Sequence, residues 1–213
     1  MPRRSPTLSV EAFLAGLEDP AVADDEATAA MLDATSALLA TYGVRRWSMD
    51  DVAERSGVAR ATVYRRFESR DELVHATLAR DARRFFEAIA EAVAHIDAIE
   101  DKVVEGVLVG LRLARQSLMS GPQSRDTNGL LSLLTAAPVL ALARRALVER
   151  YQVVTGAELP AEGLAEAELV AEALVRLGVS FVLMPDSVID LDDTDSARRS
   201  LRRVVGPLLT PDQ

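Results

Sequence analysis

The sequence predicts an all-α protein, and three observations lead to that prediction. Apolar residues recur at helical spacing along most of the 213 residues, between typical helix-start residues and glycines or prolines typical of helix ends. Hydrophobic residues make up 49% of the chain and aromatic residues only 4%, which favours helices over strands. No segment has the turn chemistry of a β-hairpin. The length suits one small and one larger domain.

Residues suited to catalysis or metal binding are scarce. The chain has no cysteine, which excludes disulfides, thiolate metal sites and cysteine nucleophiles. Its two histidines, His75 and His95, are far apart in the sequence, and there is no P-loop or GxGxxG motif. We therefore expect no enzyme activity, no metal and no cofactor. With no signal peptide and no apolar stretch of membrane-spanning length, we expect a cytoplasmic protein without membrane contact.

Charge is distributed unevenly. The formal net charge is −9, and no Lys or Arg occurs between Ser5 and Val44. The following segment carries the arginines Arg45, Arg46, Arg55, Arg60, Arg65, Arg66 and Arg70. Such a basic patch on an acidic chain suggests a local site for a polyanion. The alternative is a solvated helical face whose arginines are balanced by Asp50, Asp51, Glu54 and Glu68.

The helical pattern divides the chain into three parts. Residues 1–24 form an N-terminal extension, either disordered or folded as a short helix with Val10, Phe13, Leu14 and Leu17 on one face. Residues 25–75 form a first domain and residues 76–213 a second one, with no flexible linker between them. A short apolar segment spans 130–135. The predicted helices span 25–42, 49–55, 59–67, about 70–95, 102–119, 138–155, 161–184 and a last stretch ending near 209.

The segment Ser48–Leu73, SMDDVAERSGVARATVYRRFESRDEL, has the pattern of a helix-turn-helix. Ser48 and Asp51 have the spacing of a capping box, and Gly57 supplies the residue that tolerates positive φ in the turn. Val58, Val63 and Phe67 are expected to hold the second helix against the core, and Trp47 to pack between the first two helices.

The opposite face of that second helix is expected to point outward. Ala61 and Arg65 lie on it, Thr62 and Tyr64 flank it, and Arg60 projects from its N-terminal end. A small residue lets a helix approach the floor of the major groove, arginine can bond guanine, and hydroxyls can hold phosphates.

This string of residues resembles the TetR family of repressors. The resemblance runs from about Ala27 to Phe86 and includes Tyr42-Gly43, the stretch SGVARATVYRRF and the run from Ser69 to Leu73. It implies an N-terminal three-helix DNA-binding domain joined to a C-terminal helical domain for ligand binding and dimerisation. The DNA-binding residues that it implies are Ser48, Arg60, Ala61, Thr62, Tyr64, Arg65, Arg66 and Arg70.

By matching position, Arg60 and Arg65 would meet base edges, while the hydroxyl-bearing residues and the other arginines would contact the DNA backbone. The chain departs from the family pattern at two places. Ala59 replaces a common serine that would cap the second helix of the motif, which could cost ~1 kcal/mol of local stability. Glu68 stands where proline is common.

A second interface is predicted in the C-terminal domain. The segment LVAEALVRLGVSFVLM is apolar on two sides and needs two packing partners. TetR proteins pair through their last two helices, so we expect a homodimer; a fully buried monomer core is the alternative. The expected interface residues are Val170, Leu174, Leu177, Gly178 and Phe181.

The resemblance also implies a pocket for a small-molecule effector, expected to be hydrophobic, among the middle helices. Its candidate lining residues are Phe85, Phe86, Arg112, Gln116, Met119, Asn128 and Tyr151.

We therefore expect a transcriptional regulator, a repressor that a small molecule releases from double-stranded operator DNA. The alternative is a helical protein-interaction module without sequence-specific DNA binding, which would not need the basic helix.

Overall fold

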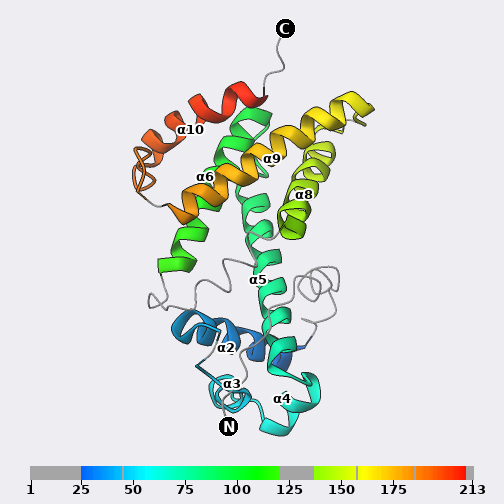
Figure 1. The fold of residues 1–213 in the computed structure, drawn as a ribbon, viewed down its shortest axis with the longest axis vertical. Helices are drawn as coiled ribbons and strands as arrows, with labels where there is room; N and C mark the ends of the chain where they lie inside the picture. Colours follow the sequence, from blue (N-terminus) through cyan, green and yellow to red (C-terminus); the bar gives the residue numbers. More distant parts are fainter. Residues whose placement is uncertain (1–24, 45, 120–136, 157, 185, 210–213) are drawn as a thin grey trace. The chain divides into compact units, whose positions relative to one another are not determined.

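A computed structural model describes residues 25–44, 46–119, 137–156, 158–184 and 186–209, and all regular structure in these ranges is helical (Figure 1). The all-α prediction is confirmed. The helices are α2 (Glu26–Tyr42), α3 (Met49–Ser56), α4 (Arg60–Arg66), α5 (Arg70–Ala92), α6 (Ile99–Met119), α8 (Ala137–Thr155), α9 (Ala161–Leu183) and α10 (Thr194–Leu209). The extension and the segment 130–135 lie outside the described residues.

The start of α2 is capped by Asp25. Its carboxylate accepts hydrogen bonds from the backbone N–H of Thr28 at 2.7 Å and from the Thr28 hydroxyl at 2.6 Å. These bonds favour the charged form and lower the pKa of Asp25. At the other end Gly43 adopts a φ of 66°, and its N–H bonds to the carbonyl of Leu39. Both ends of the helix therefore fall within a residue of their predicted places.

The predicted helix-turn-helix is formed by α3 and α4. Ser48 and Asp51 make the predicted capping box, in which each side chain accepts from the other residue's backbone N–H. Gly57 then turns the chain in the left-handed region, with φ 71° and ψ 6°. Ala59 provides no side-chain cap for α4, so tertiary packing must compensate for the missing bond.

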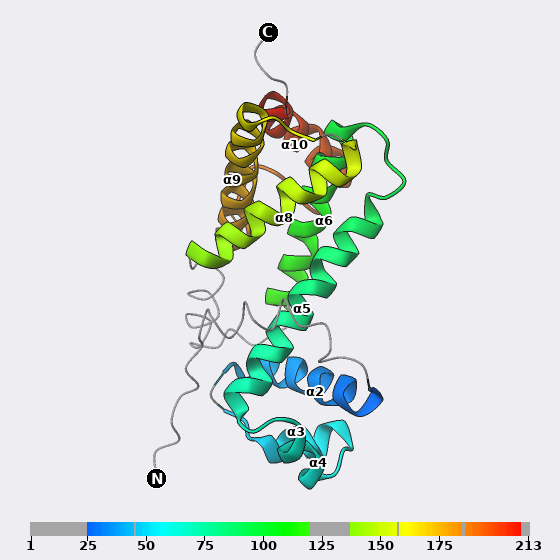
Figure 2. The ribbon, with the colours of Figure 1, turned by 90° about the vertical axis from the view of Figure 1, so that its right-hand side faces the viewer.

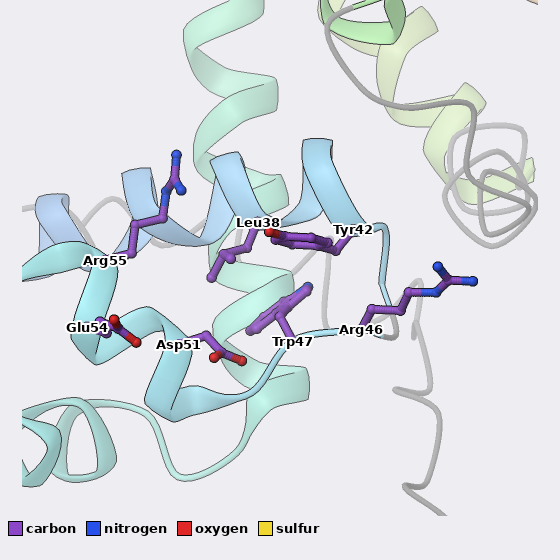
Figure 3. A pocket seen from close by; sticks show the side chains of 7 residues that line it. All are labelled: Leu38, Tyr42, Arg46, Trp47, Asp51, Glu54 and Arg55. Carbon is purple, nitrogen blue, oxygen red and sulfur yellow. The ribbon is translucent and has the colours of Figure 1, made fainter.

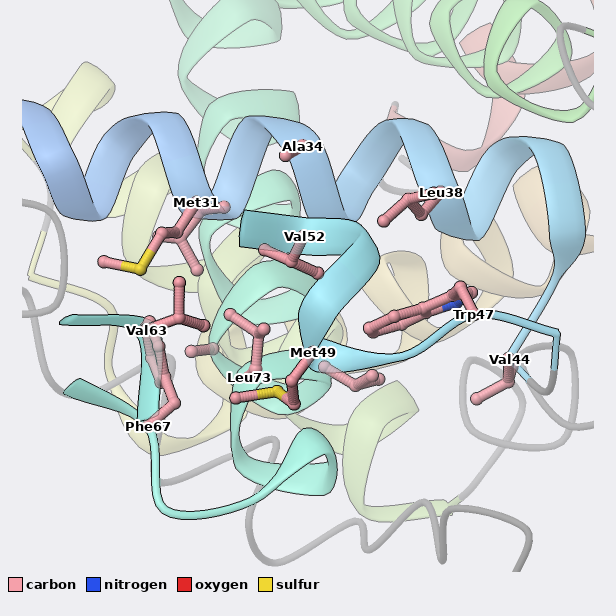
Figure 4. Packing of buried hydrophobic residues seen from close by; sticks show 13 residues of the cluster. Met31, Ala34, Leu38, Val44, Trp47, Met49, Val52, Val63, Phe67 and Leu73 are labelled. Carbon is pink, nitrogen blue, oxygen red and sulfur yellow. The ribbon is translucent and has the colours of Figure 1, made fainter. Parts of the chain in front are cut away.

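That packing comes from a core shared by α2, α3, α4 and the first turns of α5 (Figure 4). Trp47 is 1% exposed, and its indole N–H donates to the carbonyl of Gly43 at 2.9 Å, which confirms its packing role. Val63 and Phe67 are also buried here and hold α4 in place. The short helix is therefore anchored by one face, and its other face is left open.

The described residues form two compact units, with one boundary after Phe85 inside α5 and another after Arg115 inside α6. In the second unit, α6 and α10 contribute Val104, Leu108, Leu201 and Val205 to a separate core. Helices α8 and α9 pack side by side (Figures 1 and 2). The boundaries predicted at residues 24 and 75 remain predictions.

Candidate DNA-binding site

The exposed face of α4 is basic and bears hydroxyls. Val63 is 0% exposed and points into the core, whereas Tyr64 on the neighbouring position is 44% exposed. Arg60, Ala61 and Arg65 are exposed as well, and Thr62 is half-buried at the edge of the face. The predicted division of α4 into a buried and an outward side is thus present in the structure.

One acidic residue lies within this basic surface. The Nε atom of Arg60 is 2.8 Å from Oδ1 of Asp50, the second residue of α3. The Tyr64 hydroxyl donates to the same oxygen at 3.4 Å, and the Arg60 guanidinium lies 5.5 Å from the centre of the Tyr64 ring. Asp50 therefore joins two predicted DNA contacts, although sequence reasoning treated it only as a balancing charge.

The remaining predicted backbone contacts also have structural partners. Ser48 is half-buried and caps α3. Nε of Arg66, an exposed residue, donates to the Thr28 hydroxyl on α2 at 3.1 Å. The guanidinium of the half-buried Arg70 stacks over the Trp47 ring at 4.4 Å from its centre. These side chains tie the ends of the motif to the core beside the exposed face of α4.

Sequence analysis did not anticipate a hollow of about 600 Å³ between α2 and α3 (Figure 3). Two arginines and two carboxylates surround its aromatic and aliphatic floor, so charges of both signs meet there. Its lining residues are Leu38, Tyr42, Arg46, Trp47, Asp51, Glu54 and Arg55. Among the described residues, no group of His, Asp or Glu side chains has an arrangement that could hold a metal ion.

The predicted pocket residues are not brought together into one described cavity. Arg112 binds the segment before α10: its Nε and Nη2 donate to the Leu191 carbonyl at 3.2 and 3.0 Å, and Nη2 donates to the Thr194 hydroxyl at 2.6 Å. Phe86 and Gln116 are exposed, whereas Phe85 and Tyr151 are half-buried. The Met119 side chain and all of Asn128 lie outside the description.

A hollow of about 330 Å³ in the second unit shares none of the predicted pocket residues. It is lined by the end of α5, by α6 and by α10, and it contains the ion pair between Arg198 and Glu105 at 2.9 Å. That hydrogen bond and charge raise the pKa of Arg198.

The residues predicted at a dimer interface share α9. Val170, Leu174, Leu177, Gly178 and Phe181 are all half-buried within one chain. Leu174 and Phe181 pack against the core of the second unit, so part of the predicted interface stripe faces the chain's own interior. Leu164, Leu169, Leu183 and Met184, which the prediction omitted, are exposed.

A short helix with a buried apolar side and an exposed basic side, set behind a glycine turn, defines a helix-turn-helix DNA-binding protein. The family model "Bacterial regulatory proteins, tetR family" matches residues 31–77. The model "Bacterial Tetracyclin repressor, C-terminal domain" matches residues 85–207, more than half of the chain.

The chain belongs to the TetR family, and it is a DNA-binding transcriptional repressor rather than an enzyme. Regulators of this family bind operator DNA as dimers and respond to small-molecule effectors. The expected fold class and the expected role as a DNA-binding transcriptional repressor are confirmed, and the interaction-module alternative is set aside.

Two solved structures match the chain over most of its length. The TetR family repressor AlkX from Dietzia sp. strain DQ12-45-1b is 24% identical, with a TM-score of 0.55 over 87% of this chain and 96% of its own. The repressor QsdR from R. erythropolis is 21% identical, with a TM-score of 0.46 over 88% and 97% of the two chains. No curated protein sequence matches the chain.

Within the described ranges, no helix has the length and apolar character needed to cross a membrane.

Proposed function

We propose that a homodimer of this chain inserts α4 of each subunit into the major groove of one operator and that an apolar small molecule releases it. The exposed basic face of α4 carries this proposal. Arg60 and Arg65 would meet base edges, and Thr62, Tyr64, Ser48, Arg66 and Arg70 would meet the sugar-phosphate backbone. Ala61 would let the helix approach the groove floor. The two α4 helices would then lie ~34–36 Å apart, or a multiple of that distance.

The dimer requirement follows from the size of the reading surface. Helix α4 has only seven residues, so one copy offers few base contacts, and a symmetric pair doubles them. We assign the pairing surface to α9, where Leu177 and Gly178 are half-buried and Leu169 is 64% exposed. A Cβ added at Gly178 would meet no atom within 4 Å, so the position has room for close approach by a second copy.

Release by an effector requires a ligand that binds one conformer better than the other. The helix α5 starts beside the DNA-binding motif and continues into the second unit, so a change in its tilt would alter the placement of α4. The effector is proposed to be apolar because the helices that would enclose it, α6 and α8, are rich in leucine, valine and alanine.

The DNA half of the proposal is tested with duplexes selected by the full-length protein from a random-sequence library. Binding of a selected duplex is measured by fluorescence anisotropy over a range of salt concentrations. Arg65→Ala should weaken binding roughly five- to 150-fold, because a bidentate arginine–guanine contact is worth ~1–3 kcal/mol. Thr62→Ala should weaken it less and more evenly across sequences. Each lost phosphate contact should reduce the log–log salt slope by about 0.9.

Arg150→Ala provides the matched control, because Arg150 is an exposed arginine on α8 of the second unit and is not part of the motif. It should bind like the wild type. The proposal is wrong if Arg65→Ala and Thr62→Ala both bind the selected duplex like this control.

The effector half is tested with medium-chain alkanes, fatty acids and aromatic compounds. A compound that raises the melting temperature of the protein but leaves operator affinity unchanged would contradict release by that ligand.

A further inference from the structure

Arg60 has side-chain partners within its own chain, although its side chain is 67% exposed. A free arginine side chain has many rotamers, and immobilising it on DNA costs conformational entropy. Here the guanidinium is fixed from one side by Asp50, through Nε at 2.8 Å, and from another by the ring of Tyr64. The carboxylate also accepts from the Tyr64 hydroxyl. Three side chains from α3 and α4 thus restrain one another on the exposed face.

The way in which Asp50 holds Arg60 determines what the arginine can still bind. The ion pair uses Nε, and the two terminal amino groups, Nη1 and Nη2, make no hydrogen bond to another described residue. They form a fork with parallel N–H groups. Among the base edges of the major groove, guanine presents two neighbouring acceptors, N7 and O6, to such a fork.

We propose that Asp50 is a specificity-determining positioning residue, which fixes Arg60 by its Nε atom so that the terminal fork reads a guanine in each half-site. The inference rests on the proposed function, because it requires α4 to enter the major groove.

The charge of Asp50 also has a direct effect on DNA binding. At a surface that faces phosphates, a carboxylate repels DNA of any sequence. While Asp50 is paired with Arg60, the arginine is also less available to bind a phosphate. Asp50 therefore lowers affinity for unrelated DNA and raises discrimination at one base pair. Removing it should change these two quantities in opposite directions.

The experiment measures base preference rather than affinity alone. The full-length wild type, Asp50→Ala, Asp50→Asn and Arg60→Ala each select duplexes from the same random-sequence library, and the enrichment of each base is counted at every position. The wild type should prefer guanine at one position of each half-site, by roughly five- to 150-fold for a bidentate contact. Arg60→Ala should erase this preference.

Asp50→Ala should reduce the same preference to a few-fold while binding of unrelated duplex rises several-fold. Asp50→Asn should lie between the wild type and Asp50→Ala, because it keeps the size and polarity of the side chain but loses its charge. In a chain that already carries Arg60→Ala, adding Asp50→Ala should leave the base preferences unchanged, because Asp50 acts through Arg60.

Glu54→Gln is the control for charge. Glu54 is an exposed carboxylate on the same helix, so its loss changes the net charge equally without contacting Arg60. It should raise binding of unrelated DNA and leave every base preference intact. Circular dichroism and size-exclusion chromatography verify that each variant is folded and keeps its oligomeric state.

The outcomes separate this inference from the proposed function. If Arg60→Ala erases a guanine preference that Asp50→Ala leaves intact, Asp50 does not position the arginine and the inference is overturned. If Arg60→Ala changes no base preference while Arg65→Ala still abolishes selection, the inference is likewise overturned and the proposed DNA-binding mode stands. If none of these variants changes selection, the proposed function fails as well.

Discussion

Arg80 and Arg84 bind the same carboxylate oxygen, Oδ1 of Asp33, but they differ in burial. The Arg80 side chain is 4% exposed and its Nη1 atom is 2.8 Å from that oxygen; the Arg84 side chain is 54% exposed and its Nη1 atom is 3.0 Å away. Arg80 also binds Asp81 through Nη2 at 2.8 Å and the carbonyl of Ala29 at 3.3 Å. Replacing each arginine with alanine separates the effect of burial from that of the shared partner.

The magnitudes follow from the environment of each side chain. Breaking a fully buried ion pair costs ~3–5 kcal/mol, chiefly because the other charge stays buried. Asp33 is 59% exposed and Asp81 is 35% exposed, so both can recover water when Arg80 is removed. Lost hydrogen bonds to charged groups and lost packing of the aliphatic stem remain. We expect Arg80→Ala to lower the free energy of unfolding by about 2–4 kcal/mol, and Arg84→Ala by about 0.2–1 kcal/mol.

Urea unfolding monitored by tryptophan fluorescence measures this difference. Trp47 is the single tryptophan and is 1% exposed in the core of the first unit, so its emission reports the unit that contains both arginines. Arg80→Lys should fall between the wild type and Arg80→Ala, because an ammonium cannot reproduce the guanidinium fork. The reasoning is refuted if Arg84→Ala destabilises as much as Arg80→Ala, or if Arg80→Ala costs less than about 1 kcal/mol.

Three further predictions use other features of the structure. Burial lowers the pKa of His75 from its ordinary 6.5. Below that pH the unfolded chain binds more protons than the folded one, so the free energy of unfolding should fall as the pH drops through 6.5. In urea titrations His75→Gln should reduce this pH dependence, whereas the control His95→Gln, at an exposed site, should not. Gly178→Leu should keep the monomer fold but raise the dimer dissociation constant at least tenfold by analytical ultracentrifugation; an unchanged constant would move the interface elsewhere. Ala59→Ser should add a cap to α4 and raise unfolding free energy by about 0.5–1 kcal/mol; no gain would mean that the first turn of α4 is already satisfied.

Local features of the fold were predictable because they depend on residues a few positions apart. The Ser48–Asp51 box and the Gly57 turn are recognised from spacing and residue type alone. Ser69 and Glu72 have the same capping-box spacing as Ser48 and Asp51, but only one of the two hydrogen bonds of such a box forms there. Ser69 does accept from the Glu72 N–H at 3.1 Å, but the Glu72 carboxylate accepts from the N–H of Glu68 at 2.8 Å.

Contacts between distant residues were not predictable in the same way. Arg112 is a polar residue in an apolar helix, which suggested a pocket. In the structure its guanidinium instead donates to the Leu191 carbonyl and to the hydroxyl of Thr194, the first residue of α10. Asp50 and Arg60 are ten positions apart and meet only because the turn folds α4 back against α3. Helical periodicity gives the face on which a residue lies, but tertiary packing determines which side chain it meets.

The placement of Asp50 is best understood together with the charge of the whole chain. A net charge of −9 gives the whole protein a field that repels DNA. Salt screens this repulsion beyond a Debye length of ~8–10 Å. Attraction is therefore confined to the few arginines that reach the groove, and unrelated sequences gain little from approaching. Asp50, a carboxylate within that basic face, also weakens binding of unrelated DNA at contact distance, because it pairs with Arg60 and competes with phosphates for it. Both features weaken contacts that any DNA could make, and they therefore increase the share of affinity that comes from base-specific contacts.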